Sequence, residues 1–120
     1  MLEESHIVRL LDIANAACHK GMVLEARTIF DSVLVIKPGH VPALIGHALS
    51  HIVVNELGKA ETMLRDILAN HEGDADAMAL LGFCLILMKR KDEATALLEP
   101  LKDTEGSAGK LAQSLLLQAL

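Results

Sequence analysis

Two histidines one helical turn apart have the spacing best suited to chemistry in this sequence. His47 and His51 are four residues apart, so a helix would place them on one face, as it does two ligands of a metal ion. Both fall at core-facing positions of the repeat described below, and no cysteine, aspartate or glutamate is in obvious reach as a third ligand. We therefore expect paired core histidines and no metal site.

A cysteine and a histidine next to each other are the second candidate for chemistry. Cys18 and His19 would point in different directions from a helix, which does not suit a nucleophile and its base. The sequence also has no glycine-rich phosphate loop, no nucleophile elbow and no carboxylates clustered in apolar surroundings. We expect no catalytic residue and no cofactor, and so a protein that is not an enzyme.

Composition narrows the class of partner. The 120 residues suit a single domain, and 52% of them are apolar, although only 2 are phenylalanine and none is tyrosine or tryptophan. The net charge of −5 argues against nucleic acid, which needs a basic face. The longest apolar run, Met78 to Met88, is too short to span a bilayer.

The ends and the cysteines suggest a location. The N-terminus, Met1 to Ser5, is acidic and lacks the basic start of a signal peptide. Cys18 and Cys84 are far apart in the sequence, which favours two reduced thiols. We expect a cytoplasmic protein that does not insert into the membrane.

A frame of small and bulky residues recurs every 34 positions. Alanines stand at 26, 60 and 94. The positions four later hold Phe30, Leu64 and Leu98, those seven later hold Val33, Ile67 and Leu101, and those twelve earlier hold Ala14, Ala48 and Gly82. This pattern resembles the tetratricopeptide repeat (TPR), an array of helix hairpins that presents a curved surface to another protein.

The repeat places the elements. The resemblance implies an all-α fold, a right-handed superhelix of three TPR hairpins plus a C-terminal helix, in a single domain of residues 1–120. We expect repeats at about 7–40, 41–74 and 75–108 and a tail helix at about 109–120. The expected helices are 6–19, 23–36, 41–54, 57–70, 75–88, 91–102 and 109–120, with Pro100 shortening or kinking the sixth.

Packing assigns roles to the repeated positions. The small residues let helices approach closely, and bulky neighbours fill the space beside them. The bulky residues expected there are Leu10, Ile13, Leu44, Met78 and Leu81.

In a TPR array, the first helix of each hairpin lines the concave side, which forms a groove. Once the core positions are assigned, aliphatic residues remain on this side. Met78 to Met88 is apolar on every face, so its groove side needs a cover. An amphipathic apolar helix of another protein suits such a groove. The residues expected to bind it are Val8, Leu11, Ile45, Leu49, Ile52, Val53, Ala79, Phe83, Ile86 and Leu87.

Two alternatives remain for what covers the apolar groove. The tail helix could fill the groove with its own leucines, which stand at 111, 115, 116, 117 and 120. The chain could instead associate with itself, as a homodimer when the partner is absent or as a TPR scaffold. A general adaptor that reads an unrelated peptide is a further alternative.

The sequence also resembles the small TPR chaperones of bacterial type III secretion. The likeness rests on residues 7–14, on Glu25-Ala26-Arg27, on residues 34–39 and on residues 79–84. The length favours the class that binds the needle subunit. That class holds the amphipathic C-terminal helix of a polymerising subunit in its groove, which prevents premature assembly, and works with a small helical co-chaperone.

The resemblance implies contacts on this chain. The cargo would touch the groove residues of the second and third repeats: Ile45, Leu49, Ile52, Val53, Phe83, Ile86 and Leu87. The co-chaperone would lie near Val8, Leu11 and the second helix.

Overall fold

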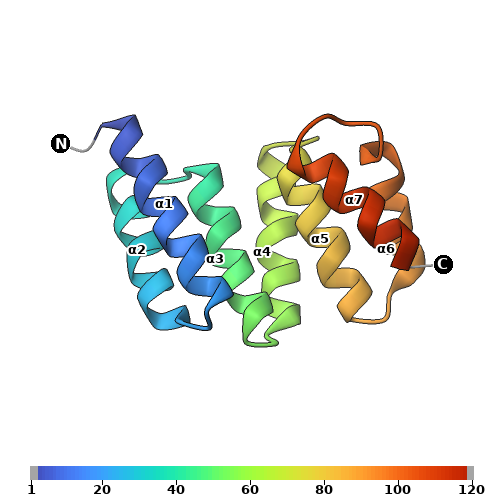
Figure 1. Ribbon diagram of the computed structural model, residues 1–120, viewed down its shortest axis with the longest axis horizontal. Coiled ribbons are helices and arrows are strands. Elements are labelled where there is room, and N and C mark those ends of the chain that lie inside the picture. The colour runs from blue at the N-terminus through green and yellow to red at the C-terminus, as the bar shows by residue number, and fades with distance from the viewer. Residues whose placement is uncertain (1–2, 119–120) are drawn as a thin grey trace. The chain divides into compact units, whose positions relative to one another are not determined.

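The computed structural model describes residues 3–118, and within that range all regular structure is helical (Figure 1). The helices are α1 (Glu4–His19), α2 (Val23–Ile36), α3 (Val41–Val53), α4 (Leu57–Asn70), α5 (Ala75–Leu87), α6 (Lys91–Leu98) and α7 (Ser107–Gln118), with a 3-10 turn, η1 (Glu99–Leu101), after α6. The all-α fold class is confirmed. Apart from the end of α6, the predicted bounds agree within two residues, and positions 119–120 of the tail lie outside the described residues.

Pro100 ends α6 early, as expected. The α-helix stops at Leu98 and gives way to the 3-10 turn that contains the proline. Proline has no N–H to donate to the carbonyl four residues earlier, and its ring clashes with that carbonyl. The predicted shortening is therefore confirmed.

The turns repeat the period of the sequence in backbone conformation. Within the hairpins, residues with positive φ stand 34 positions apart: Gly21 (81°), Asn55 (64°) and Lys89 (65°). Between repeats they are Gly39 (78°), Gly73 (82°) and Gly106 (97°), the last 33 positions after its predecessor. Positive φ is the left-handed region that glycine adopts without steric cost. The shorter third interval matches a tail helix that starts at Ser107 and not at 109.

The chain divides into two compact units between Glu56 and Leu57. In the N-terminal unit, α1 and α2 pack as a hairpin and α3 packs against both. In the C-terminal unit, α5 packs against α4, α6 and α7. The prediction that residues 1–120 act as one domain stays a prediction. No described helix is both long enough and apolar enough to cross a membrane.

The core of the N-terminal unit is built around Phe30. Its side chain is fully buried with Ile7, Ala14 and Val33. Its ring lies against Gly46 of α3, where an added Cβ would be 2.2 Å from the ring carbon Cε1. Ile13 was expected to supply bulk here, but that prediction is wrong because its side chain is exposed. Ile13 lies next to the buried Ala14 in sequence, and helical periodicity turns it away from the core.

The core of the C-terminal unit is aliphatic. Leu64, Leu81, Leu85 and Leu98 are fully buried. A Cβ on Gly82 would lie 2.6 Å from Cδ2 of Leu98, so the small residue allows α5 and α6 to pack closely. The packing role expected of Gly82 is confirmed.

Candidate protein-binding surface

The first helix contributes less to the predicted surface than the sequence indicated. Val8 is exposed on α1, where a partner can reach it. Leu11 is only 6% exposed and packs in the core with Ile7 and Ala14. Its place four residues after Ile7 and three before Ala14 puts it on the same helix face as these two residues. Leu11 is therefore a core residue, and its assignment to the binding surface is corrected.

The third helix presents an apolar edge. Val53 is 40% exposed at the end of α3. Ile45 and Leu49 are half-buried, and Leu49 packs against the core of the N-terminal unit. Ile52 is buried, so it supports the surface without forming part of it. The available apolar area of α3 thus comes from Val53 and the outer parts of Ile45 and Leu49.

The fifth helix presents a similar edge in the other unit. Leu87 is 43% exposed, and Phe83 and Ile86 are half-buried. Ala79 is only 1% exposed, because three helices pack around α5 and its methyl group is short. Ala79 is therefore corrected from a binding residue to a core residue. The tail helix α7 packs against α5 as well as α6, so it covers part of the apolar circumference of α5.

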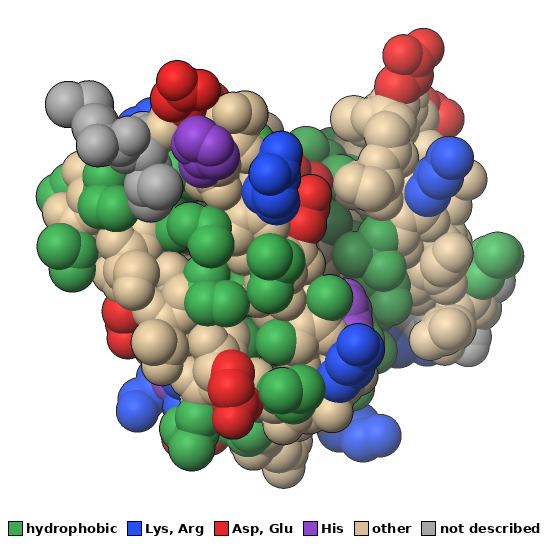
Figure 2. Space-filling view, turned by 60° about the vertical axis from the view of Figure 1, so that its left-hand side comes forward, with side chains coloured by type: hydrophobic (Ala, Val, Ile, Leu, Met, Phe, Trp, Pro, Cys, Tyr) green, Lys and Arg blue, Asp and Glu red, His purple; other side chains and the backbone are tan. Residues whose placement is uncertain are grey.

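Exposed hydrophobic side chains also occur outside the predicted surface. Figure 2 shows them spread over one face of the N-terminal unit, with charged side chains among them. The large ones of this unit that lie outside the predicted surface are Ile13, Met22, Leu24, Val35, Ile36 and Val54. Leu24 is 75% exposed on α2, and it therefore offers a matched control for any substitution on α3 or α5.

The two histidines belong to a polar cluster that joins α2 to α3. Arg27 donates from Nε to the Ser50 hydroxyl (2.9 Å) and from Nη2 to Oε1 of Glu56 (2.9 Å). Its Nη2 also lies 2.9 Å from Nδ1 of His51, which in turn lies 2.9 Å from the same Glu56 oxygen. Ser50 and His51 are buried. The cluster therefore satisfies polar groups that would otherwise be buried without partners.

His47 completes the cluster. Its ring centroid is 5.2 Å from that of His51, and its Nε2 lies 3.2 Å from Oδ1 of Asp31 on α2. Burial lowers the pKa of His47, and the Asp31 carboxylate opposes this shift only in part. Within residues 3–118, the buried Nδ1 of His47 has no hydrogen-bond partner.

Sequence reasoning placed the histidines in the core but missed their charged neighbours. Asp31 comes from another helix, so no short spacing connects it with His47. Glu56 follows His51 by only five residues, in the turn after α3, and this spacing could have indicated it. No group of three possible ligands in the described residues could hold a metal ion. Cys18 is buried as well, and burial raises the pKa of its thiol, which disfavours the nucleophilic thiolate.

Known structures share this fold at low sequence identity. SycD, the type III secretion translocator chaperone of Yersinia enterocolitica, matches with a TM-score of 0.74 and 12% identity over 99% of this chain and 84% of that chain. A tetratricopeptide repeat protein from Parabacteroides merdae matches with a TM-score of 0.67 and 15% identity over 98% and 46%. A double mutant of MamA matches with a TM-score of 0.59 and 20% identity over 98% and 75%.

The family is shown by the sequence itself. No curated protein matches the chain in sequence. The profile of the tetratricopeptide repeat, however, matches residues 54–119, which is more than half of the chain. Together with the helix hairpins and the 34-residue period of the turns, this match identifies the protein as a member of the tetratricopeptide repeat family.

Proposed function

We propose that this protein is a chaperone of the type III secretion class that binds an amphipathic apolar helix of a secreted subunit. The observation that supports it most is the apolar edge on α3 and on α5, with Val53 and Leu87 exposed. Families of this repeat bind other proteins, and SycD, which shares the fold, is described as a translocator chaperone.

The proposal extends to the kind of cargo. A needle-type subunit polymerises through an apolar helical face, and covering that face in the bacterial cytoplasm would prevent premature assembly. Val53, Ile45 and Leu49 would bind the helix on one unit, and Phe83, Ile86 and Leu87 on the other. A small helical co-chaperone would bind near Val8 on α1.

The energetic scale suits such a role. Complete burial of one aliphatic or phenyl side chain contributes roughly 1.5–3 kcal/mol. Several partly exposed side chains on each unit can therefore support binding after the costs of association are subtracted. Because these residues are already half-buried, each contributes only a part of that range.

The test is co-expression with needle and translocator subunits of type III secretion systems, followed by co-purification. We expect a defined complex with a needle subunit, and the double variant Val53→Glu/Leu87→Glu should lose at least about tenfold in affinity because each carboxylate would be buried against apolar cargo. Leu49→Glu and Phe83→Glu should have the same effect, but they also lie against their own units, so helicity must be checked by circular dichroism.

The matched control is Leu24→Glu/Val35→Glu, which adds the same two charges at exposed apolar sites of α2. This variant should retain the complex. Equal loss in both double variants would contradict the assignment of the surface. A translocator subunit captured in place of a needle subunit would retain the chaperone class and refute the needle-type cargo.

Self-association is the alternative that the exposed residues of α2 favour. A homo-oligomer that forms without cargo and dissociates in the Leu24→Glu/Val35→Glu variant would support a TPR scaffold. Sedimentation velocity of the chain alone distinguishes the two functions.

A further inference from the structure

Three atoms of the polar cluster form a triangle in which only two hydrogen bonds can exist at once. Nη2 of Arg27, Nδ1 of His51 and Oε1 of Glu56 lie 2.9 Å from one another in all three pairs. The guanidinium donates and the carboxylate accepts, so their contact is favourable in every state. A histidine nitrogen accepts without a proton and donates with one. Nδ1 of His51 can therefore form a hydrogen bond with Arg27 or with Glu56, but not with both.

The proton on Nδ1 of His51 decides between the two contacts. Without the proton, the lone pair of Nδ1 accepts from Arg27, and the carboxylate of Glu56 faces a second acceptor. With the proton, the N–H donates to Glu56, and the guanidinium of Arg27 faces another donor. Because His51 is buried, bulk water does not replace the contact that is lost, and each state favours one neighbour of the ring over the other.

The remaining titratable groups near the His51 ring come from three helices. Helix α3 itself brings His47, whose ring centroid is 5.2 Å away, and α2 brings Asp31, which lies 3.2 Å from His47. Helix α1 packs against α2 and α3 and brings the thiol of Cys18 near Arg27. Burial raises the pKa of this thiol, so it stays neutral. Among the described residues, the ions in contact with the ring are thus the cation and the anion of the triangle.

The same ion pair recurs one repeat later with its charges reversed. Glu61 and Arg90 stand 34 positions after the two ions of the triangle, and they pair at 2.7 Å. Leu85 stands 34 positions after His51, is fully buried and has no group to titrate. The ion pair therefore forms in the C-terminal unit without a histidine beside it. In the N-terminal unit, the histidine adds a proton-dependent contact that the ion pair alone does not have.

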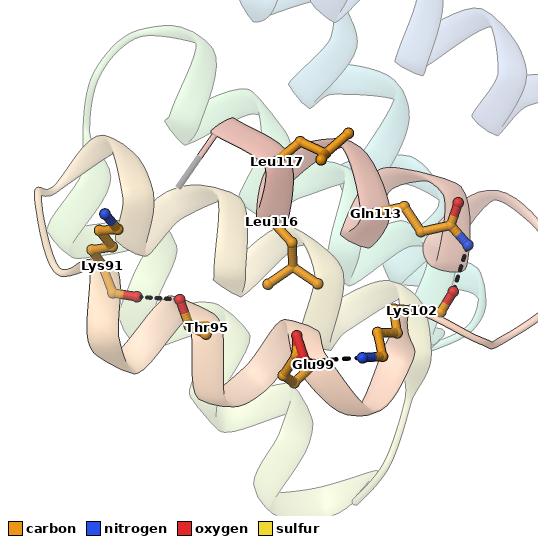
Figure 3. A pocket seen from close by; sticks show the side chains of 7 residues that line it. All are labelled: Lys91, Thr95, Glu99, Lys102, Gln113, Leu116 and Leu117. Carbon is orange, nitrogen blue, oxygen red and sulfur yellow. Dashed lines mark hydrogen bonds and ion pairs between the residues drawn. The ribbon is translucent and has the colours of Figure 1, made fainter. Parts of the chain in front are cut away.

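The third repeat has an uncharged residue at this position. Thr95 stands 34 positions after Glu61, and its hydroxyl donates to the carbonyl of Lys91 in its own helix (2.9 Å; Figure 3). The repeat itself therefore does not require an ion here. The triangle of guanidinium, imidazole and carboxylate is a particular feature of the N-terminal unit.

We propose that the proton on Nδ1 of His51 is a pH-sensitive switch, which attaches the ring to Arg27 of α2 when the proton is absent and to Glu56 of the following turn when it is present. Histidine is the side chain that takes up a proton between about pH 8 and 5. Val53 of the predicted surface lies between His51 and Glu56 in sequence, at the end of α3. The switch therefore acts on the part of α3 that carries this surface residue.

The test is an NMR titration of the full chain between about pH 8 and 5, in which the side-chain nitrogens of histidine and arginine are observed directly. We expect Nδ1 of His51 to be unprotonated at the upper end of this range and protonated at the lower end. The side-chain N–H signals of Arg27 and the amides of residues 53–56 should change with the same midpoint. The amides around Leu85 should stay constant, because the ion pair there has no histidine beside it.

Three variants separate the two contacts. Arg27→Gln removes the competing cation and should raise the proton affinity of the ring about threefold, whereas Glu56→Gln removes the anion and should lower it about threefold. His51→Leu introduces the residue that the C-terminal unit has at the equivalent position, so the ion pair should still form. The pH-dependent change in the turn should then be absent.

His47→Gln is the matched control, since it removes the neighbouring ring and should retain the transition at residues 53–56. A single protonation state of Nδ1 over the whole range would overturn the proposal, as would a transition in the turn that persists in His51→Leu. Midpoints that move in the same direction in Arg27→Gln and Glu56→Gln would also overturn it, because the ring would then not choose between them. Circular dichroism verifies that each variant is folded. No partner takes part in this test, so its outcome is independent of the proposed chaperone function.

Discussion

The two units join their helices with different chemistry. In the N-terminal unit, a polar cluster centred on Arg27 connects α2 to α3, and the guanidinium contacts its buried members Ser50 and His51. In the C-terminal unit the buried contacts around α5 are aliphatic, and the guanidinium of Arg90 pairs with Glu61 and Glu93 at the surface. The same sequence repeat thus allows neighbouring helices to pack through polar contacts in one unit and through apolar contacts in the other.

The units also differ in the glycine that lies against the bulky residue of the repeat. Phe30 and Leu98 occupy the same repeat position, four after the alanine. Phe30 lies against Gly46 of the helix that follows, whereas Leu98 lies against Gly82 of the helix that precedes it. The period therefore fixes where the bulky side chain is, whereas the glycine that lies against it differs between the two units.

The largest difference between the units should come from adding one methyl group. Gly46→Ala places a Cβ 2.2 Å from the buried ring of Phe30, which cannot bend away, and should lower the free energy of unfolding by about 3 kcal/mol. Gly82→Ala meets the flexible end of Leu98 at 2.6 Å and should lower it by only about 1 kcal/mol. Hydrogen exchange of the amides in α2 and in α5 measures each unit separately.

Gly58→Ala is the control for this pair. A Cβ there meets nothing within 4 Å, so the alanine should be neutral or stabilising. Equal losses for Gly46→Ala and Gly82→Ala would show that the phenyl ring adjusts as readily as a leucine side chain.

An intermediate difference should come from removing an arginine. Arg27→Ala removes the hydrogen bond to the buried Ser50 hydroxyl and the contacts with His51 and Glu56, and should cost about 1–2 kcal/mol. Ser50 still donates to the carbonyl of His47, and His51 still lies 2.9 Å from Glu56. Arg90→Ala removes ion pairs with the exposed Glu93 and with Glu61, whose side chain is 15% exposed, but it leaves no buried residue unpaired, so its effect on unfolding should be smaller. Urea unfolding measures the free energy of unfolding of each variant. A larger loss of stability in Arg90→Ala than in Arg27→Ala would contradict the distinction between the helix contacts of the two units.

The smallest difference should appear with pH. Because the folded state lowers the pKa of His47, the unfolded state binds more protons, and the N-terminal unit should lose stability as pH falls below about 6.5. In the C-terminal unit, hydrogen bonds from Arg90 lower the pKa of Glu61, so the stability it contributes should be lost only as pH falls below about 4.5.

Hydrogen exchange of α3 and α5 between pH 7 and 4 would resolve the two steps, and His47→Gln should remove the first. A first step that persists in His47→Gln would assign it to another group.

The fold was predictable because its signals are local and repeated. Alanine and glycine at fixed intervals, together with Gly39, Gly73 and Pro100 at helix ends, specify helices that the structure reproduces. The binding surface was less predictable, since it depends on what the neighbouring helices cover. Leu11 and Ala79 occupy groove positions of the repeat, yet their surroundings bury them.

The polar cluster was beyond sequence reasoning for a related reason. Arg27 reads as an exposed residue of a second helix, and Glu56 as part of a turn. Glu56 lies five residues after His51, but only the packing of α2 against α3 brings Arg27 to both of them.

The hairpin turns have a consequence for how such a chain can arise by duplication. Gly21, Asn55 and Lys89 share one left-handed backbone conformation. Glycine adopts it without steric cost, asparagine with a small steric cost and lysine with a larger one. This turn therefore does not require glycine. A copied segment of 34 residues can lose its glycine and still turn, since the helices on either side hold the chain in place, and the turns are then free to vary among descendants while the frame stays the same.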